Sequence, residues 1–282
     1  MQMKNRQSLA VWLAAQLSAA LAAALLAPAA AQAQNVATAL SQISANADYM
    51  SQNYHEADGY NPYTGLKVWD RELGTIPGAS VDIGYLASPL TGVTNLYLGG
   101  SFQYNDGNVS YHGTSISGVY RINSTTGTRI DNGFVEVGKG FYIGSQDFML
   151  VPTLFWGQRD WRRTLPSYWE DYRTERLGAA VRGALGLTDR LTLTGRAGVA
   201  ATLYPDMQAS IEVPGLKFRQ GGDPVYEAEA GLDYLVVGNW HVRSTADISA
   251  FDYGQSNAND GFEEPSSSTV DISVKVGIGY SF

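Results

Sequence analysis

The chain closes on an unbroken two-residue alternation, TVDISVKVGIGYSF. Every even position from Val270 to Phe282 is large and apolar, and every odd position between them is polar, charged or glycine. Period 2 is the pattern of a β-strand with one apolar face. A strand of a soluble sandwich is seldom this long, whereas about ten tilted residues suffice to cross a bilayer. The pattern therefore raises the possibility that lipid covers the apolar face.

The same alternation recurs upstream, most clearly in Arg176–Leu187, Leu191–Leu203, Val225–Val236 and Trp240–Ala250. Ten strands are expected, with eight or twelve as alternatives. Twelve would require another hairpin within residues 105–133, and eight would leave the first hairpin outside the wall. The ten expected ranges are about 65–75, 78–88, 94–105, 133–144, 147–157, 173–187, 190–204, 223–236, 239–253 and 268–282.

Connection lengths indicate how these strands are arranged. Short turns such as GLTDRL and VVGNW alternate with long connections, expected at 105–133, 157–172, 205–223 and 254–267. This asymmetry is typical of transmembrane barrels. The predicted fold class is all-β, a transmembrane antiparallel up-and-down β-barrel. Aromatic girdles are expected at two levels, one from Tyr234, Trp240, Tyr280 and Phe282 and the other from Trp156, Tyr226 and Tyr253.

The N-terminus predicts export. Lys4 and Arg6 precede an apolar stretch from Leu9 to Leu26, and Ala31-Gln32-Ala33 follows as a small-x-small site. This order predicts a signal peptide over residues 1–33 that is cleaved. The alternative is a retained anchor, although Gln16 and Ser18 interrupt the apolar stretch. Residues 34–63 are polar and without clear alternation, and they predict a periplasmic segment before a barrel over 64–282.

Composition limits the chemistry. The chain has no Cys, so neither disulfides nor thiolate chemistry is expected. Its net charge of −8, with scattered basic residues, argues against nucleic acid as a partner. Asp160, Glu170 and Asp171 are carboxylates near one another in sequence, but nothing fixes a cation-binding geometry. No metal and no cofactor are predicted.

The exported start, the alternating strands and the ending VGIGYSF together resemble a bacterial outer-membrane β-barrel protein. The ending, with Tyr280 and Phe282, is similar to the signal that the barrel assembly machinery reads. The size is similar to that of small monomeric barrels of the OmpA-barrel or omptin class. The resemblance implies the outer membrane of a Gram-negative bacterium, with contact to its lipid and lipopolysaccharide, and a monomer.

Charged residues of both signs fall on the inward positions of the expected strands. Two interpretations follow: a lumen plugged by paired charges, or a narrow ion pore lined by charged rings. Ten strands leave little more room than eight, so the plugged lumen is favoured. The expected lumen network is Arg182, Arg196, Glu227, Glu229, Asp233, Arg243, Asp247 and Lys275.

No catalytic constellation is recognisable. The three histidines are His55, His112 and His241, and none has a nucleophile at a spacing typical of a known hydrolase. A structural or surface-interaction role without enzyme activity is therefore predicted. A narrow ion or solute pore is one alternative, and a rim-site hydrolase acting on lipid or peptide is another.

The stretch 157–175, GQRDWRRTLPSYWEDYRTE, is expected to be a surface loop rich in arginine and aromatic residues. Guanidinium groups and aromatic faces are suited to sugars and phosphates. The simpler interpretation, which is favoured, is an aromatic girdle with solvated charges. The candidate ligand contacts are Trp161, Arg162, Arg163, Trp169 and Tyr172.

Overall fold

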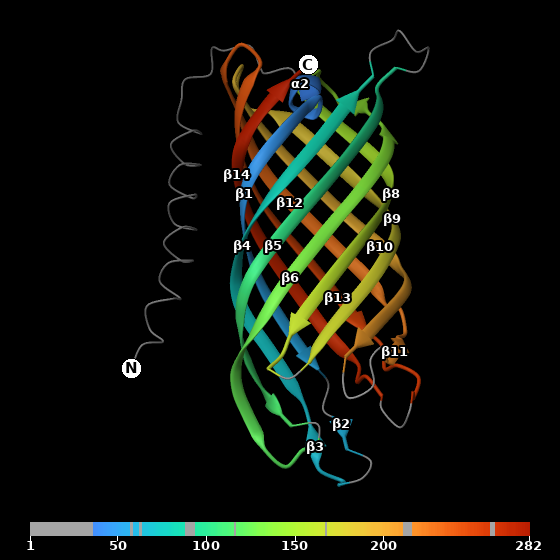
Figure 1. Ribbon diagram of the computed structural model, residues 1–282. Coiled ribbons are helices and arrows are strands. Elements are labelled where there is room, and N and C mark those ends of the chain that lie inside the picture. Colours follow the sequence, from blue (N-terminus) through green and yellow to red (C-terminus); the bar gives the residue numbers. More distant parts are fainter. Residues whose placement is uncertain are drawn as a thin grey trace. The chain divides into compact units, whose positions relative to one another are not determined.

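A computed structural model describes residues 36–282 except 57–58, 62–63, 88–93, 116, 167, 211–215 and 260–262. Ten long antiparallel strands form a closed barrel, in which each pairs with the next and the last with the first (Figure 1). The predicted fold class and strand number are confirmed. The strands are β1 (Gln42–Glu56), β4 (Asp70–Leu86), β5 (Leu96–Thr114), β6 (Arg121–Lys139), β8 (Phe148–Thr164), β9 (Trp169–Gly186), β10 (Leu191–Ala209), β12 (Pro224–Val237), β13 (Trp240–Tyr253) and β14 (Ser267–Ser281).

Short elements complete the described chain. The five-residue helix α2 (Val36–Leu40) precedes β1. No described helix has the length and hydropathy needed to span a membrane. The minor strands are β2 (Gly59–Tyr60), β3 (Lys67–Val68), β7 (Phe141–Tyr142) and β11 (Leu216–Arg219). The predicted signal peptide, residues 1–33, lies outside the described residues.

The prediction for the first strand of the barrel is wrong. β1 lies inside the segment expected to precede the barrel, and it pairs with both β4 and β14. Conversely, the expected strands 65–75 and 78–88 are one strand, β4. β4 runs without a break through Gly74, Pro77 and Gly78, where the two expected ranges meet. β1 was missed because small Ala45 and Ala47 stand at its outward positions and weaken the alternation.

Two expected long connections are extensions of the wall. β5 and β6 pair over nineteen residue pairs from Leu96↔Lys139 to Thr114↔Arg121, so most of 105–133 is a regular hairpin. β8 and β9 likewise pair out to Thr164↔Trp169. We call this side of the barrel the loop end, and the opposite side, with α2 and the C-terminus, the turn end. The length asymmetry therefore lies mainly in strands that continue past the lipid-facing zone.

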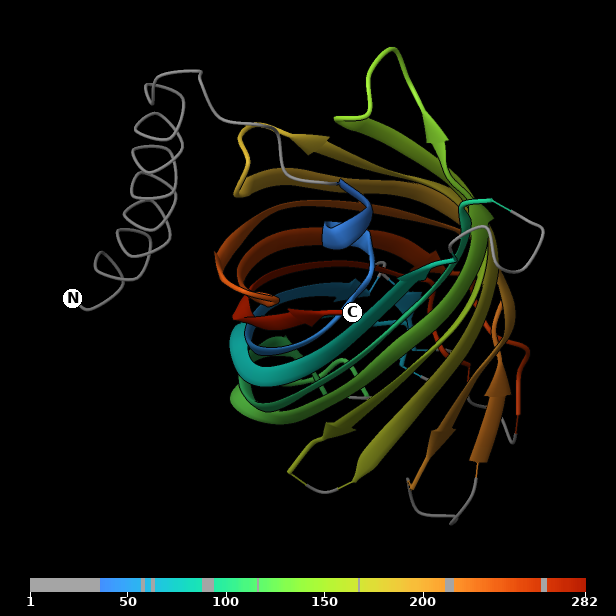
Figure 2. The ribbon, with the colours of Figure 1, turned by 90° about the horizontal axis from the view of Figure 1, so that it is seen from above.

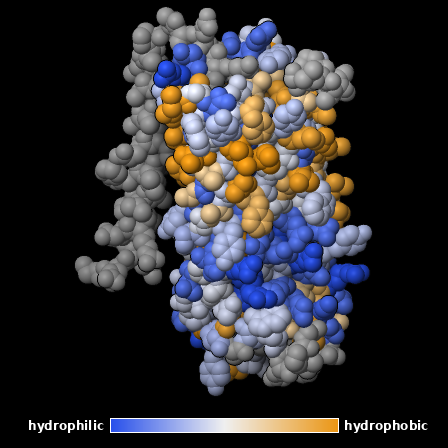
Figure 3. Space-filling view, turned by 45° about the horizontal axis from the view of Figure 1, so that its top comes forward, coloured by the Kyte–Doolittle hydropathy of each residue, from blue (hydrophilic) through white to orange (hydrophobic). Residues whose placement is uncertain are grey.

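The outer surface divides along the barrel axis. Figure 3 shows a hydrophobic zone toward the turn end and a hydrophilic zone beyond it. At ~3.3 Å per residue, a nineteen-residue strand is roughly 60 Å long, about twice what a tilted strand needs to cross a bilayer. The exposed apolar residues of the first zone include Ile43, Val81, Ile83, Leu98, Phe102, Val135, Val137, Leu154, Leu177, Val181, Val199, Val242, Ile272, Val276 and Ile278.

Most expected girdle residues face outward. Trp240 contacts Tyr280 edge-on, with ring centroids 5.1 Å apart, and Phe282 stacks near Tyr85. Trp156 and Tyr226 are also exposed. Tyr253 is the exception: it lies on the inward positions of β13, is 2% exposed and shares a hydrogen bond with Thr174. It belongs to the interior.

The interior is filled at both ends. Viewed along the axis in Figure 2, α2 lies within the ring of strands. Its Val36 and Leu40 pack with Tyr97, Met149 and Val151 at the turn end. A larger cluster with many aromatic residues fills the loop end; it includes Tyr54, Ile76, Val109, Ile130, Phe155, Trp161, Tyr172, Met207, Phe218, Phe251 and Tyr253.

Candidate functional site

The centre of the lumen holds a network of ion pairs built around Glu136 on β6. Its side chain is fully buried, and its two oxygens accept from Arg182 (2.9 Å) and Arg196 (3.0 Å). Val135 and Val137 face outward, so alternation places Glu136 inward, yet it was not singled out from the sequence. Arg182 and Arg196 are register neighbours on β9 and β10, so the shared carboxylate separates two like charges.

Acidic residues of β12 complete this network. Glu229 contacts Arg182 at 3.3 Å, and Glu227 contacts Arg196 at 2.7 Å. Glu227 also pairs with Arg176 at 2.9 Å. Each guanidinium therefore has carboxylate partners, as buried charges require.

The remaining predicted lumen residues lie on the inner wall as well. Lys275 on β14 pairs with Asp247 on β13 at 2.7 Å. Arg243 lies 3.5 Å from Asp233 and 4.0 Å from Asp82. All eight residues of the predicted network therefore take part in ion pairs inside the barrel.

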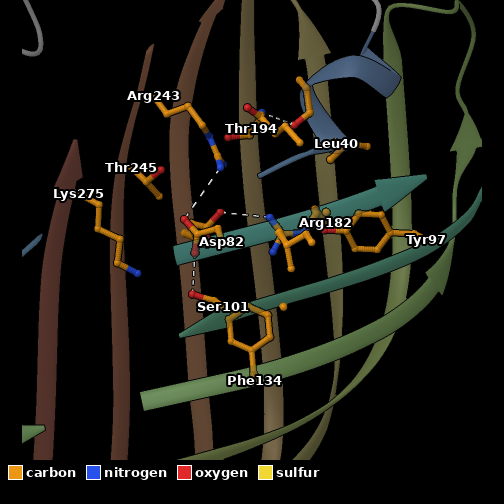
Figure 4. Close-up of a pocket in the computed structure, with 16 residues that line it drawn as sticks. Leu40, Asp82, Tyr97, Ser101, Phe134, Arg182, Thr194, Arg243, Thr245 and Lys275 are labelled. Carbon is orange, nitrogen blue, oxygen red and sulfur yellow. Dashed lines mark hydrogen bonds and ion pairs between the residues drawn. The ribbon is translucent and has the colours of Figure 1, made fainter. Parts of the chain in front are cut away.

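A small polar cavity lies between this network and α2 (Figure 4). Its volume is about 40 Å³, room for about three waters at ~10–15 Å³ each. Leu40 of α2 borders it, and Ser101 donates to Asp82 (2.6 Å) on its wall. Arg182, Arg243 and Lys275 supply its basic groups. All three are paired, so the cavity is a small polar pocket within a neutralised core.

Asp233 is the hub of the turn end. It accepts from Gln42 Nε2 at 2.7 Å and lies 2.6 Å from His241 Nδ1. His241 Nε2 in turn lies 3.2 Å from Ser281 Oγ. The order Asp–His–Ser matches a charge-relay triad in its distances. However, all three residues are at most 3% exposed, and Ser281 Oγ also donates to the Asn239 carbonyl. The group ties β1, β12, β13 and β14 together.

The loop end contains a second charged cluster, centred on Arg163. Its guanidinium contacts Asp70 (2.6 Å), Glu170 (2.8 Å), Glu72 (3.1 Å) and Glu56 (3.2 Å). It also lies over the rings of Tyr54 and Trp161. Four carboxylates thus surround one cation, and Arg163 is 1% exposed.

The expected ligand-binding loop is therefore split between two faces of the wall. Because the strands continue, side chains from 157 to 175 alternate inward and outward. Trp161, Arg163 and Tyr172 point inward and are each 1% exposed, so the expectation that they are surface contacts is wrong. Arg162 and Trp169 remain on the outer side, where Arg162 lies over the Trp169 ring.

The outer face near Arg162 carries a charged depression of about 440 Å³ just beyond the apolar zone. Arg162 makes a two-pronged contact with Asp171 (2.5 and 2.6 Å). Arg173 lies 3.8 Å from Asp160, and Arg129 pairs with Asp131. Trp161, Tyr172, Asp206, Gln208 and Lys217 complete the lining. Four cationic and four anionic side chains therefore line the depression, from β6, β8, β9, β10 and β11.

The predicted assembly signal lies at the turn end. Tyr280 and Phe282 are 42% and 57% exposed on the outer face. Among the described residues, no group of three or more His, Asp or Glu side chains is arranged to hold a metal ion.

No family model and no curated protein matches the chain. Solved structures do. The outer membrane protease OmpT from Escherichia coli shares 10% identity over 86% of this chain and 97% of its own, with a TM-score of 0.60. The β domain of the Bordetella autotransporter BrkA shares 15% identity over 86% and 100%, with a TM-score of 0.42. The translocator domain of NalP from Neisseria meningitidis shares 10% over 98% and 97%, with a TM-score of 0.40. The match to OmpT shows a shared barrel fold.

Proposed function

We propose that this chain, which has the fold of an outer-membrane β-barrel, is a closed, non-conducting protein of a Gram-negative outer membrane. The observation that carries the proposal is the filled lumen. Apolar packing against α2, the ion pairs around Glu136 and the aromatic cluster with Arg163 follow one another along the axis. The cavity of about 40 Å³ has room for only a few waters. Closely paired charges favour a plug over the charged rings of an ion path.

The orientation follows from the two zones of the outer surface. The apolar zone suits the hydrocarbon core, and the long polar extensions suit the cell exterior. The turn end, with α2 and the C-terminus, then faces the periplasm. Tyr280 and Phe282 at that end suit recognition by the assembly machinery. A closed sheet has no free strand edge, which supports a monomer.

Single-channel recording tests the closed lumen. We expect residues 34–282, refolded into planar bilayers, to give no steady current steps under conditions where an open porin gives them. Reproducible steps from the purified barrel would overturn the proposal and support the narrow pore instead.

We further propose that the charged depression beside Arg162 binds the phosphorylated headgroup of lipopolysaccharide. On β6, its residues Arg129 and Asp131 lie on the loop-end side of the exposed Val135 and Val137, where a lipid headgroup layer would meet the wall. Guanidinium groups pair with phosphates, and neighbouring aspartates suit the divalent cations that bridge them. The depression has four charges of each sign, which matches a layer containing both phosphates and cations.

A binding assay with purified lipopolysaccharide tests this surface. Replacing Arg162→Gln and Lys217→Gln together is expected to weaken binding about five- to tenfold, as the loss of two exposed ion pairs at about 0.5–0.7 kcal/mol each implies. Arg190→Gln, on an exposed turn at the opposite end, is the control. Equal binding by the unsubstituted protein, the double variant and the Arg190→Gln control would contradict this role.

We propose no catalytic role for the Asp233–His241–Ser281 group. Its burial leaves no path for a substrate to reach Ser281 Oγ, whose hydrogen bonds are made within the wall. A fluorophosphonate probe that labelled Ser281 in the folded barrel would revive the rim-site hydrolase.

A further inference from the structure

A single hydroxyl at the loop end lies within hydrogen-bond distance of two buried carboxyl groups. Tyr172 Oη is 2.5 Å from Glu264 Oε1 and 3.1 Å from Glu170 Oε2. A phenol has one hydrogen and can donate it to one acceptor at a time. If both acids were ionised, one of these contacts would place two oxygen lone pairs against each other. The geometry therefore requires one additional proton.

The surrounding charges indicate which acid carries that proton. Burial raises the pKa of both acids, but Arg163, which lies 2.8 Å from Glu170, opposes the rise more strongly at Glu170 than at Glu264. Glu264 has no Arg or Lys within ion-pair distance among the described residues, and it is 8% exposed. A protonated Glu264 would donate to Tyr172, and Tyr172 would donate to Glu170. This chain of hydrogen bonds then ends at the ion pair between Glu170 and Arg163.

Glu264 also belongs to a different part of the chain from the other acids. It lies between β13 and β14, where residues 254–259 and 263–266 are described, whereas the other acids are on strands. Within that connection its backbone N–H donates to Ser256 Oγ (2.8 Å), and its carbonyl accepts from the Ser256 N–H (2.9 Å). The contact with Tyr172 therefore ties a cross-braced connection to the wall.

We infer that Glu264 is a protonated carboxyl that anchors residues 263–266, the described residues just before β14, in the barrel mouth, and that these residues detach from the wall when Glu264 ionises. The inference is independent of whether the lumen conducts. Ionisation would add another negative charge to a cluster that already holds four carboxylates and one guanidinium. Glu264 interacts with Tyr54 and Glu56 on β1, Asp70 on β4, Arg163 on β8, and Glu170 and Tyr172 on β9. Glu72 on β4, Tyr111 on β5 and Tyr168 in the turn after β8 are the other titratable groups around Arg163.

The pH range over which the contact weakens follows from the raised pKa of Glu264. Burial, and secondly the charge of Glu170, raise the pKa of Glu264 from 4.5 to about 8. A raised pKa in the docked state means that docking is strongest below pH 4.5 and weakens as the pH rises toward 8, above which it levels off. The full weakening of the docking equilibrium is on the order of a thousandfold.

Thiol labelling tests the inference, because the chain has no native cysteine. Ser267 lies at the base of the connection, is 5% exposed, and its hydroxyl has no hydrogen-bond partner among the described residues, so Ser267→Cys is a mild probe. Its maleimide labelling rate is compared with that of Ser267→Cys/Glu264→Gln, which keeps a donor to Tyr172 but cannot ionise. The ratio cancels the intrinsic pH dependence of the thiol.

We expect this ratio to rise at least tenfold between pH 5 and 8 and then to level off. The exposed neighbour Glu263 supplies the control, and Glu263→Gln is expected to keep the profile of Ser267→Cys alone. Global unfolding would raise labelling in every variant and leave the ratio near one. A ratio that stays within twofold from pH 5 to 9 overturns the inference. So does a pH dependence that Glu170→Gln abolishes and Glu264→Gln preserves.

Discussion

The two halves of the lumen handle charge in opposite ways. In the turn half, Arg182, Arg196 and Lys275 each have their own carboxylate partners. In the loop half, Arg159 is paired with Asp271 in the same way, but four carboxylates surround the guanidinium of Arg163. The outer surface also changes along the axis, from hydrophobic toward the turn end to hydrophilic toward the loop end. A wall that faces hydrocarbon favours a neutral interior. A wall that faces water tolerates an excess of carboxyl groups over guanidinium groups, because protonation can neutralise the carboxyl groups that lack a cation.

The largest effect on stability is expected from removing the guanidinium of Arg163, which four carboxylates surround at the loop end. Arg163→Met should lower the free energy of unfolding by about 3–5 kcal/mol at neutral pH, because four carboxylates lose their counter-charge. Urea unfolding in lipid vesicles measures this. Arg162→Met is the matched control on the outer face, where the exposed pair with Asp171 is expected to contribute at most about 1 kcal/mol. Equal losses for the two neighbours would contradict the inward placement of Arg163.

Lowering the pH is expected to restore stability to a variant in the loop half but not to one in the turn half. Glu136→Gln is expected to cost about 3 kcal/mol, because Arg182 and Arg196 lose the carboxylate between them. At pH 5 the Arg163→Met variant should recover part of its stability, since its unpaired groups can take up protons. Guanidinium groups do not release theirs, so Glu136→Gln should not recover. If both variants respond alike to pH, the contrast between the halves is wrong.

The smallest effect concerns the anchoring of α2. Gln42 donates to both Asp233 and the Ala39 carbonyl, so Gln42→Met should cost about 1–2 kcal/mol. Gln52 is equally buried, but neither of its amide atoms has a partner among the described residues. Gln52→Met should therefore be neutral or stabilising. The difference between the melting temperatures of Gln42→Met and Gln52→Met measures the contribution of the Gln42 hydrogen bonds. A lower melting temperature for Gln52→Met than for Gln42→Met would contradict this prediction.

Much of the wall could be predicted because lipid on one side and a polar lumen on the other enforce alternation. β14 and its neighbours carry that pattern strongly, and the same parity placed Arg182, Glu229 and Lys275 inside. β1 escaped prediction because its outward alanines give little contrast in hydropathy. β4 was divided because Pro77 and two glycines resemble a turn.

The partners of the lumen charges could not be predicted in the same way. Alternation says that Glu136 points inward, but not that it reaches across to Arg182 and Arg196. The acidic cluster was missed because the stretch 157–175 was interpreted as a loop, which hides the parity of Arg163 and Tyr172. Glu264 carries no periodic signal at all, since it lies between strands.

The pairing of β1 with β14 sets an order of events in folding. Gln42 meets Ser281 across nearly the whole described chain, so the ring cannot close until the last residues have been synthesised. Contacts this far apart in sequence form slowly and leave unpaired strand edges open to aggregation in the meantime. Biogenesis of this protein therefore depends on keeping its first strand soluble until its final strand arrives.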